Sequence, residues 1–440
     1  MTALADRPVP ASGAPAVPPG LPHVDLLRLR DRLEPVERAR LDAIEDHLQT
    51  RVRPHLTRYW DAEEFAFDLL PGLAELGLGR LVLDGSSSLF QQLVHAEIAR
   101  VDLSLSALVG IHNELNLGMI AGLGSERQKA TWQGRLESFD ALGAFCLTEP
   151  DHGSDIAGGL ATTATRDGDE WVIRGAKRWI GAGTIADVAL VWARDTADGE
   201  IKGFVVPTDT PGVKIERNIG LYGERADEGS HALIHYDNVR VPADALLGGE
   251  GQAFVIAQTR LGGGRIHHAM RTIGLSRKAL DMMCERALSR ETQGSRLSDK
   301  QFVQGYIADS YAQLLQFRLM VLYTAWEIDK YNDYKKVRKD IAAVKVVMPT
   351  VLHDIAWRAM QVHGALGVTN EVPFLGMVTG AAVMGLADGP TEVHKTTVAK
   401  QVLRDYRPAE GTWPSEWIPA KREAARAKYA QFLEHEVGNL

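Results

Sequence analysis

The sequence predicts an α+β fold in which a block of helices, a sheet and a second block of helices follow one another along the chain. Residues 23–142 carry apolar side chains at three- and four-residue steps, which is the period of amphipathic helices. Residues 143–250 switch to short alternating runs that are rich in β-branched and aromatic residues and end at Gly, Pro or Asp. Helical periodicity returns in residues 251–408. Helices and strands in separate blocks favour α+β over a doubly wound α/β fold, in which they would alternate.

The expected domains follow this change of period. Residues 1–22, rich in Ala and Pro, are expected to form a disordered arm. Residues 409–440 are expected to form a tail helix, which packs either on a neighbouring subunit or on its own domain. The clearest helical segments are residues 33–56, 65–78, 271–290 and 339–364. The clearest strands of an antiparallel middle domain are residues 170–183, 187–195, 201–209 and 232–242. Three folded domains are therefore expected between two terminal extensions.

Composition limits the partners of the chain. Its 440 residues are 45% hydrophobic and 24% charged, as in an ordinary globular enzyme, and the formal net charge is -8. An acidic chain is a poor partner for nucleic acid, and the longest basic cluster, residues 335–339, is expected on a solvated helix face. Cys146 and Cys284 lack metal-ligand or disulfide spacing, so a reducing compartment and no bound metal are expected. No segment suits a signal peptide or a membrane span, so the expected location is the cytoplasm, with no membrane partner.

One polar segment, residues 144–155 with the sequence AFCLTEPDHGSD, carries the strongest functional signal. Thr-Glu-Pro followed by Gly-Ser-Asp forces a bend that gathers a hydroxyl and several backbone N–H groups around one point. Together with RGAKRWI (residues 174–180) and LADGPTEVH (residues 386–394), this segment resembles the acyl-CoA dehydrogenase family, over roughly residues 25–408. The resemblance implies an N-terminal helical domain, a middle antiparallel β domain and a C-terminal four-helix bundle, with FAD between the last two.

The resemblance assigns the flavin to the middle domain. Main-chain groups of Phe145 and Leu147 and the Thr148 hydroxyl are expected at its pyrimidine edge, where donors stabilise the charge that forms on reduction. Gly153 and Ser154 are expected near the pyrophosphate, and Ser154 is also expected near the substrate.

Trp179 takes the position of a tryptophan that lies over the dimethylbenzene ring of the flavin in the family, although an isolated Trp in a strand is ordinarily a packing residue. Gly181 and Ala182 stand where many relatives have Thr-Asn. Gly181 is therefore expected to offer flavin N5 only its backbone N–H.

Residues of the C-terminal block are expected to bind the far end of FAD. In SRETQG (residues 289–294), Arg290 matches an arginine that pairs with the pyrophosphate of a neighbouring subunit's FAD, because its planar fork meets two phosphate oxygens. The remaining expected cofactor contacts are Gln293, which replaces a usual Phe, and Gln361, Gly364, Pro390 and Glu392. A site shared between subunits implies a homotetramer or a dimer.

The chemistry implied by the resemblance needs a base opposite the flavin, because an α-proton must leave as the β-hydrogen departs as hydride. Most relatives use a Glu, and the aligned residue here is Asp388, with the adjacent Gly389 expected to contact the substrate. A second family solution places Glu before the arginine of a long helix, but the pair here is Gly264-Arg265. Asp388 is therefore the expected catalytic base, and Arg265 is expected to orient it and to contact the substrate.

Two parts of the chain resemble different branches of the family. The Asp-Gly-Pro segment and GRIHHAMRTIG (residues 264–274) are similar to the Asp-base branch typified by acyl-CoA dehydrogenase family members 10 and 11, whereas the N-terminal half is similar to glutaryl-CoA dehydrogenase. Residues 105–108 lack the Arg that holds a second carboxylate, which disfavours a dicarboxylic substrate. His267 and His268 adjoin the expected cleft and are interpreted as packing or hydrogen-bonded neighbours rather than catalysts.

The resulting hypothesis is an FAD-dependent acyl-CoA dehydrogenase of fatty acid metabolism, which forms a trans-2-enoyl-CoA and passes electrons to electron-transfer flavoprotein. One alternative is a nitroalkane-oxidase-like flavoprotein oxidase, which also uses an Asp base but needs no CoA and reacts with oxygen. A second alternative is a flavin-binding family member that no longer turns over.

Overall fold

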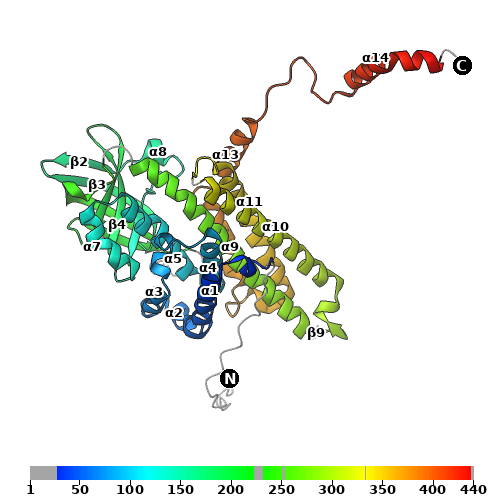
Figure 1. Cartoon of the computed structure of the whole chain (residues 1–440). Helices are drawn as coiled ribbons and strands as arrows, with labels where there is room; N and C mark the ends of the chain where they lie inside the picture. Colours follow the sequence, from blue (N-terminus) through cyan, green and yellow to red (C-terminus); the bar gives the residue numbers. More distant parts are fainter. Residues whose placement is uncertain (1–26, 222–230, 250–252, 332, 438–440) are drawn as a thin grey trace, which may run out of the picture. The chain divides into compact units, whose positions relative to one another are not determined.

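The computed structural model describes residues 27–221, 231–249, 253–331 and 333–437, with side chains for all of these except residues 253–263 and 433–437 (Figure 1). The expected disordered arm, residues 1–22, lies outside the described residues. Contacts divide the chain after Lys395 into two units. The first unit contains the N-terminal helices, the sheet and the helical bundle.

The N-terminal part of the first unit is helical. Its helices are α1 (Pro35–His47), α2 (Leu56–Ala62), α3 (Leu70–Glu75), α4 (Ser88–Val101), α5 (Leu103–Gly110), α6 (Gly118–Leu123) and α7 (Glu126–Glu137), with a π-helix, η6 (Ile111–Leu117), between α5 and α6. The apolar faces of α1 to α5 share one core, in which Phe90, Ile98 and Leu108 are buried, whereas α6 and α7 pack with strands of the sheet. The carboxylate of Asp102 accepts a hydrogen bond of 2.7 Å from the backbone N–H of Leu105 and so caps α5. This cap starts a new helix directly after α4.

The middle part is a sheet with the strand order β6-β7-β3-β2-β4-β5-β8, and β1 also pairs with β4. The strands are β1 (Gly143–Cys146), β2 (Thr163–Asp167), β3 (Glu170–Gly181), β4 (Val188–Asp195), β5 (Ile201–Pro207), β6 (Val213–Ile219), β7 (His231–Pro242) and β8 (Leu246–Leu247), with a short helix α8 (Ile156–Gly159) between β1 and β2. Most pairs are antiparallel, as expected, but β1 and β2 each pair with β4 in parallel. Neither parallel pair is joined by a tight turn, which only antiparallel neighbours allow.

The C-terminal part of the first unit is a bundle of α9 (Ala253–Ser289), α10 (Gln301–Tyr331), α11 (Arg338–His363) and α12 (Phe374–Leu386). It ends in the first turn of α13 (Thr391–Leu403), because the boundary after Lys395 falls within this helix. A hairpin of β9 (Glu291–Thr292) and β10 (Ser295–Arg296) joins α9 to α10. Phe317, Leu352 and Phe374 are buried in the common core of the bundle. The basic cluster of residues 335–339 lies mainly in the turn before α11, so its prediction as a helix face was wrong for Lys335 and Lys336, both of which are exposed.

Buried charges join α9 of the bundle to α4 of the N-terminal helices. Arg100 on α4 lies 3.0 Å from the carboxylate of Asp281 on α9. Arg277 on α9 lies 3.4 Å from the carboxylate of Glu97 on α4. All four side chains are 9% exposed or less. Each charge is therefore buried with a partner of opposite sign on the other helix, which offsets the cost of removing it from water.

The second unit contains α14 (Ile418–Val437). Before this helix, the rings of Trp413 and Trp417 stack with their centroids 4.6 Å apart. Over the described ranges of both units, none of the helices combines the length and apolar character that a membrane span requires. In the same ranges, no three His, Cys, Asp or Glu side chains gather in a way that suits a metal ion.

Candidate active site

Asp388 lies in the turn between α12 and α13, where φ is 55° at Asp388 and 103° at Gly389, so two successive residues have left-handed backbone conformations. The carboxylate Oδ2 lies 3.1 Å from Nε2 of His268. Nε of Arg265 donates to the backbone carbonyl of Asp388 at 3.1 Å, and Nε2 of His394 lies 3.2 Å from the same oxygen. The side chain of Asp388 is 24% exposed. Asp388 is thus held by α9 and α13 while part of its side chain stays open to a ligand.

Lys345 is a buried cation that supports this turn. It lies on α11 with an exposure of 0%. Its Nζ donates to the carbonyl oxygens of Met384 at 2.8 Å and Ala387 at 2.7 Å, at the end of α12. Carbonyls at a helix C-terminus lack partners within the helix, so Lys345 satisfies groups that would otherwise be buried without one. Burial lowers the pKa of Lys345 to about 8. No motif of the sequence pointed to Lys345.

Opposing effects set the ionisation of Asp388. Burial favours the neutral acid, but the interaction with His268 and the charges of Lys345 and Arg265 outweigh burial and hold the pKa of Asp388 well below its ordinary value. Burial also lowers the pKa of His268 to about 4, so its imidazole is neutral at pH 7. A carboxylate only accepts hydrogen bonds, and we therefore assign the proton of His268 to Nε2. Asp388 is ionised at neutral pH, which is the state that a general base requires.

Gly264 leaves space for the carboxylate of Asp388. A Cβ atom at residue 264 would lie 3.2 Å from Oδ2 of Asp388. A side chain at this position would therefore press on the carboxylate. The absence of a side chain at Gly264 thus makes room for the carboxylate of Asp388.

The two neighbouring histidines of α9 have different surroundings. The ring of His267 lies 4.0 Å from the ring of His95, and its Nε2 lies 3.7 Å from Oε1 of Glu114. Burial lowers the pKa of His267 as well. His267 therefore packs among residues of α4 and η6, whereas His268 contacts Asp388. The sequence analysis placed both histidines near the cleft but did not distinguish them.

The Thr-Glu-Pro segment follows β1 and lies beside β3. Glu149 is buried, and its carboxylate accepts hydrogen bonds from Nζ of Lys177 at 2.9 Å and from the backbone N–H of Thr162 at 2.8 Å. Lys177, with an exposure of 0%, also donates to the carbonyl of Leu147 at 3.0 Å. This buried ion pair fixes the chain on either side of Thr148. This ion pair was not predicted from the sequence, although Glu149 and Lys177 both stand inside the motifs that carry the family resemblance.

Trp179 is an uncovered aromatic side chain next to this segment. It is 44% exposed, and its φ of 64° is unusual for a residue other than Gly. The guanidinium of Arg178 lies 4.5 Å from the centre of its ring. The backbone N–H of Arg178 donates to the carbonyl of Thr148 at 2.9 Å, so Thr148 and Trp179 are close neighbours. An exposed flat indole beside a half-buried hydroxyl fits the flat ring system of a flavin.

The other residues expected at the flavin fall into three groups. Phe145 and Leu147 pack in or against the core of the sheet, so their main-chain groups are what they can offer a ligand. Gly153 and Ser154 are exposed. A Cβ atom at Gly181 would lie 3.0 Å from Cδ1 of Ile111, which places this end of β3 against η6.

Only some of the residues that are expected at the far end of FAD lie near Asp388. Arg290 is exposed just beyond α9, about 37 Å along the helix from Arg265 at 1.5 Å per residue. Gln293, with a φ of 48°, forms the turn of the β9–β10 hairpin.

Gln361 is exposed near the end of α11, which stops at Gly364 with a φ of 64°. Pro390 and Glu392 lie at the start of α13. One chain does not bring all the expected cofactor residues together, which is what a site shared between subunits requires.

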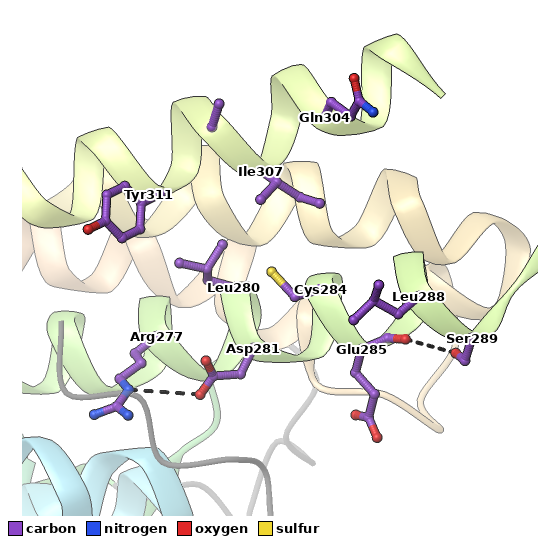
Figure 2. A pocket seen from close by; sticks show the side chains of 11 residues that line it. Arg277, Leu280, Asp281, Cys284, Glu285, Leu288, Ser289, Gln304, Ile307 and Tyr311 are labelled. Carbon is purple, nitrogen blue, oxygen red and sulfur yellow. Dashed lines mark hydrogen bonds and ion pairs between the residues drawn. The ribbon is translucent and has the colours of Figure 1, made fainter. Parts of the chain in front are cut away.

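A separate pocket of about 850 Å³ lies between α9 and α10. Figure 2 shows its lining side chains, which include Leu280, Cys284, Ile307 and Tyr311. None of the residues expected at the cofactor or substrate lines it. The pocket is thus distinct from the surroundings of Asp388.

The chain matches three family models, for the N-terminal domain (residues 34–140), the middle domain (residues 144–239) and the C-terminal domain (residues 251–403) of acyl-CoA dehydrogenase. It is 39% identical over 298 residues to acyl-CoA dehydrogenase family member 11 of Rattus norvegicus, covering 66% of this chain and 38% of that protein. It is 39% identical over 294 residues to probable acyl-CoA dehydrogenase FadE2 of Mycobacterium tuberculosis, covering 66% of this chain and 72% of that protein. A solved glutaryl-CoA dehydrogenase from Mycobacterium smegmatis in complex with FADH2 is 28% identical, with a TM-score of 0.77 over 88% of this chain and 98% of that one.

The chain therefore belongs to the acyl-CoA dehydrogenase family, and its N-terminal helices, middle sheet and C-terminal helices form the fold of that family. The fold predicted from the sequence is confirmed. Members of the family bind FAD, which was the predicted cofactor. The chain spans less than two fifths of the length of the family member 11 proteins that it matches.

Proposed function

We propose that this protein is an FAD-dependent acyl-CoA dehydrogenase that converts an acyl-CoA to a trans-2-enoyl-CoA. The observation that supports this most is the carboxylate of Asp388, which is ionised and fixed by His268 and Arg265 in a partly open site. FAD, when bound, accepts the β-hydrogen as hydride. The proton transfer and the orientation of the substrate are the work of the protein.

Asp388 removes the α-proton of the acyl group as a general base. The charge that develops on the thioester oxygen is stabilised by the backbone N–H of Asp388, because a fixed donor costs no reorganisation during the reaction. Arg265 holds the Asp388 carbonyl and Gly389 flanks the reacting carbon. An acyl chain that covers the exposed part of Asp388 excludes water and raises the pKa of the carboxyl, which makes it a stronger base than in the free enzyme.

Residues of the middle domain would hold the flavin. The Thr148 hydroxyl and the main-chain N–H groups nearby would donate to its pyrimidine edge, and the indole of Trp179 would cover its other side. Ser154 would lie near the pyrophosphate. The exposed Arg290 and Gln361 would contact FAD bound mainly to a neighbouring subunit, in a homotetramer or dimer.

The substrate is proposed to be a monocarboxylic acyl-CoA. Leu105 and Leu108 on α5 are buried, and residues 105–108 offer no cation for a second carboxylate. Because bound product shields the reduced flavin from oxygen, the electrons are proposed to leave to electron-transfer flavoprotein. A cytoplasmic location and a role in fatty acid metabolism complete the proposal.

Anaerobic titration of the flavin-loaded protein with straight-chain acyl-CoAs of increasing length tests the reaction directly, because bleaching of the flavin band reports hydride transfer. In Asp388→Asn we expect FAD and fold to be kept, and bleaching to slow by about two to four powers of ten, the scale for a positioned base. Asp309→Asn, an exposed change on α10, is the matched control and should bleach as fast as the wild type. Bleaching of Asp388→Asn within tenfold of wild type would assign the base elsewhere.

The electron acceptor separates the dehydrogenase from a nitroalkane-oxidase-like enzyme. At saturating acyl-CoA we expect slow release of hydrogen peroxide in air and fast reduction of a ferrocenium acceptor. Equal rates in the two assays, or turnover of nitroalkanes without a CoA thioester, would favour the oxidase. Bound FAD that no acyl-CoA or nitroalkane bleaches would indicate a family member without turnover.

A further inference from the structure

The two oxygens of the Asp388 carboxylate have different surroundings. Oδ2 lies 3.1 Å from Nε2 of His268 and faces Gly264, where a Cβ atom would lie 3.2 Å away. Among the described residues, none donates a hydrogen bond to Oδ1. The carboxylate is therefore fixed through one oxygen and leaves the other for a ligand.

Several charged or titratable groups surround this carboxylate, but they act at different atoms. From α9, Arg265 binds the backbone carbonyl of Asp388, and the charge of Arg271 acts on the carboxylate at longer range. His267, also on α9, is kept neutral by burial and does not contact the carboxylate. From α11, Lys345 binds the end of α12. From α13, His394 lies against the backbone carbonyl of Asp388. His268 is thus the described residue that fixes the side chain itself.

The far side of His268 argues against a proton relay. The proton on Nε2 leaves Nδ1 as an acceptor, and this buried atom has no hydrogen-bond partner among the described residues. In a relay, a carboxylate behind the imidazole would stabilise its charged form. Among the described residues no carboxylate is bonded to Nδ1, and His268 is 9% exposed in a site that disfavours a second charge.

We infer that His268 is a positioning residue for the base: its Nε2–H holds Oδ2 of Asp388 against α9 and directs Oδ1 toward the α-proton. This inference rests on the proposed role of Asp388. When Oδ1 takes the proton, Oδ2 becomes the carbonyl oxygen of a neutral acid and still accepts the hydrogen bond. The base therefore changes charge without losing its orientation. His268 stays neutral throughout.

The test compares His268→Leu with His268→Gln, because the amide N–H of Gln can replace the Nε2–H whereas Leu cannot. We measure flavin content and then anaerobic bleaching between pH 4 and pH 8 with one saturating acyl-CoA, whose acyl chain covers Asp388 and so raises its pKa from the low value of the free enzyme. His268→Leu should keep its FAD and bleach about 10- to 100-fold more slowly, which is the effect of misplacing a reacting group, with the half-saturating acyl-CoA concentration nearly unchanged. Losing the hydrogen bond raises the pKa of Asp388. The acid limb of the pH profile, where bleaching slows because Asp388 is protonated, should therefore move to higher pH. His268→Gln should restore most of the rate and the wild-type acid limb.

His267→Leu is the matched control, because it removes the adjacent buried histidine, which does not contact Asp388. Its acid limb should coincide with that of the wild type. An unshifted acid limb in His268→Leu, or equal rates for the Leu and Gln variants, would overturn the positioning role. That result differs from failure of the proposed function, in which Asp388→Asn itself would bleach at the wild-type rate.

Discussion

Nζ of Lys345 lies 2.7 Å from the carbonyl oxygen of Ala387, the residue directly before Asp388. A second hydrogen bond, of 2.8 Å, joins the same Nζ to the carbonyl of Met384. One side chain of α11 therefore fixes the end of α12 and the start of the turn that carries the proposed base. The position of Asp388 depends on a residue that touches neither of its carboxylate oxygens.

Replacing Lys345 should destabilise the protein. In Lys345→Met the two carbonyls stay buried without a donor, and we expect the free energy of unfolding to fall by about 2–4 kcal/mol. Urea unfolding of the flavin-loaded protein measures this loss. Lys335→Met, at an exposed position, should change the value by less than about 0.5 kcal/mol. Equal stability of the two variants would mean that water satisfies the carbonyls.

Gly264→Ala should raise stability and lower activity. Alanine is favoured over glycine inside a helix by up to about 1 kcal/mol, but the new methyl would lie 3.2 Å from Oδ2 of Asp388 and displace it. We expect slower anaerobic bleaching with an unchanged or higher melting temperature. Gly305→Ala on α10 is the control, because nothing lies within 4 Å of a Cβ atom there. It should stabilise the protein without slowing the reaction, and slowing in both variants would contradict a local effect.

The buried charges between α4 and α9 should be far more important for stability than an exposed network. Arg100→Met leaves the carboxylate of Asp281 buried without this partner, and we expect a loss of about 3–5 kcal/mol in urea unfolding. Arg240 pairs with Asp167 and Glu170 on the exposed surface of the sheet. Arg240→Met should therefore cost only about 0.2–1 kcal/mol. Similar losses in the two variants would show that water reaches the buried pairs.

Buried histidines should make the protein less stable in mild acid. Burial lowers the pKa of His112 to about 4, and its Nε2 lies 2.7 Å from the carbonyl of Leu136. The ordinary value of 6.5 applies to the unfolded chain, so between pH 6.5 and pH 4 the unfolded state binds a proton that the folded state does not. Stability therefore falls as the pH drops through this window, by about 2 kcal/mol per such histidine between pH 7 and pH 5.

His112→Gln tests this prediction, because its amide can keep the hydrogen bond to Leu136 but does not titrate. The difference in unfolding free energy between pH 7 and pH 5 should shrink by about 2 kcal/mol in this variant. An unchanged difference would mean that His112 is protonated in the folded protein.

The sequence could predict the order of helices and strands, because hydrophobic period depends on residues close together in the chain. It also predicted that Asp388 and Arg265 act together, since both stand in recognisable motifs, and the two residues are in contact. The parallel pairing of β1 and β2 with β4 was not predicted. Strand direction depends on how distant segments meet, which the period of one segment does not encode.

Lys345 was missed for the same reason: it is an ordinary residue of a long helix until the fold brings it to the carbonyls of residues 384 and 387. His268 was expected beside the cleft, but the sequence did not identify Asp388 as its hydrogen-bond partner. A local signal existed for the pair of Glu149 and Lys177, which lie in two adjoining motifs, but their contact needs β1 and β3 to lie side by side. Burial and charge pairing in three dimensions, rather than residue type, identify these positions.

The left-handed backbone at Asp388 constrains which acid can serve as the base. Aspartate adopts this conformation more readily than most residues because its short polar side chain can bond to the nearby backbone, and Gly389 continues the same turn at little cost. A glutamate at residue 388 would meet both a less favourable backbone and a side chain one methylene too long for the space beside Gly264. Replacing Asp388 by Glu alone is therefore expected to displace the carboxylate from His268, and a longer acid at this position would need changes in its surroundings as well.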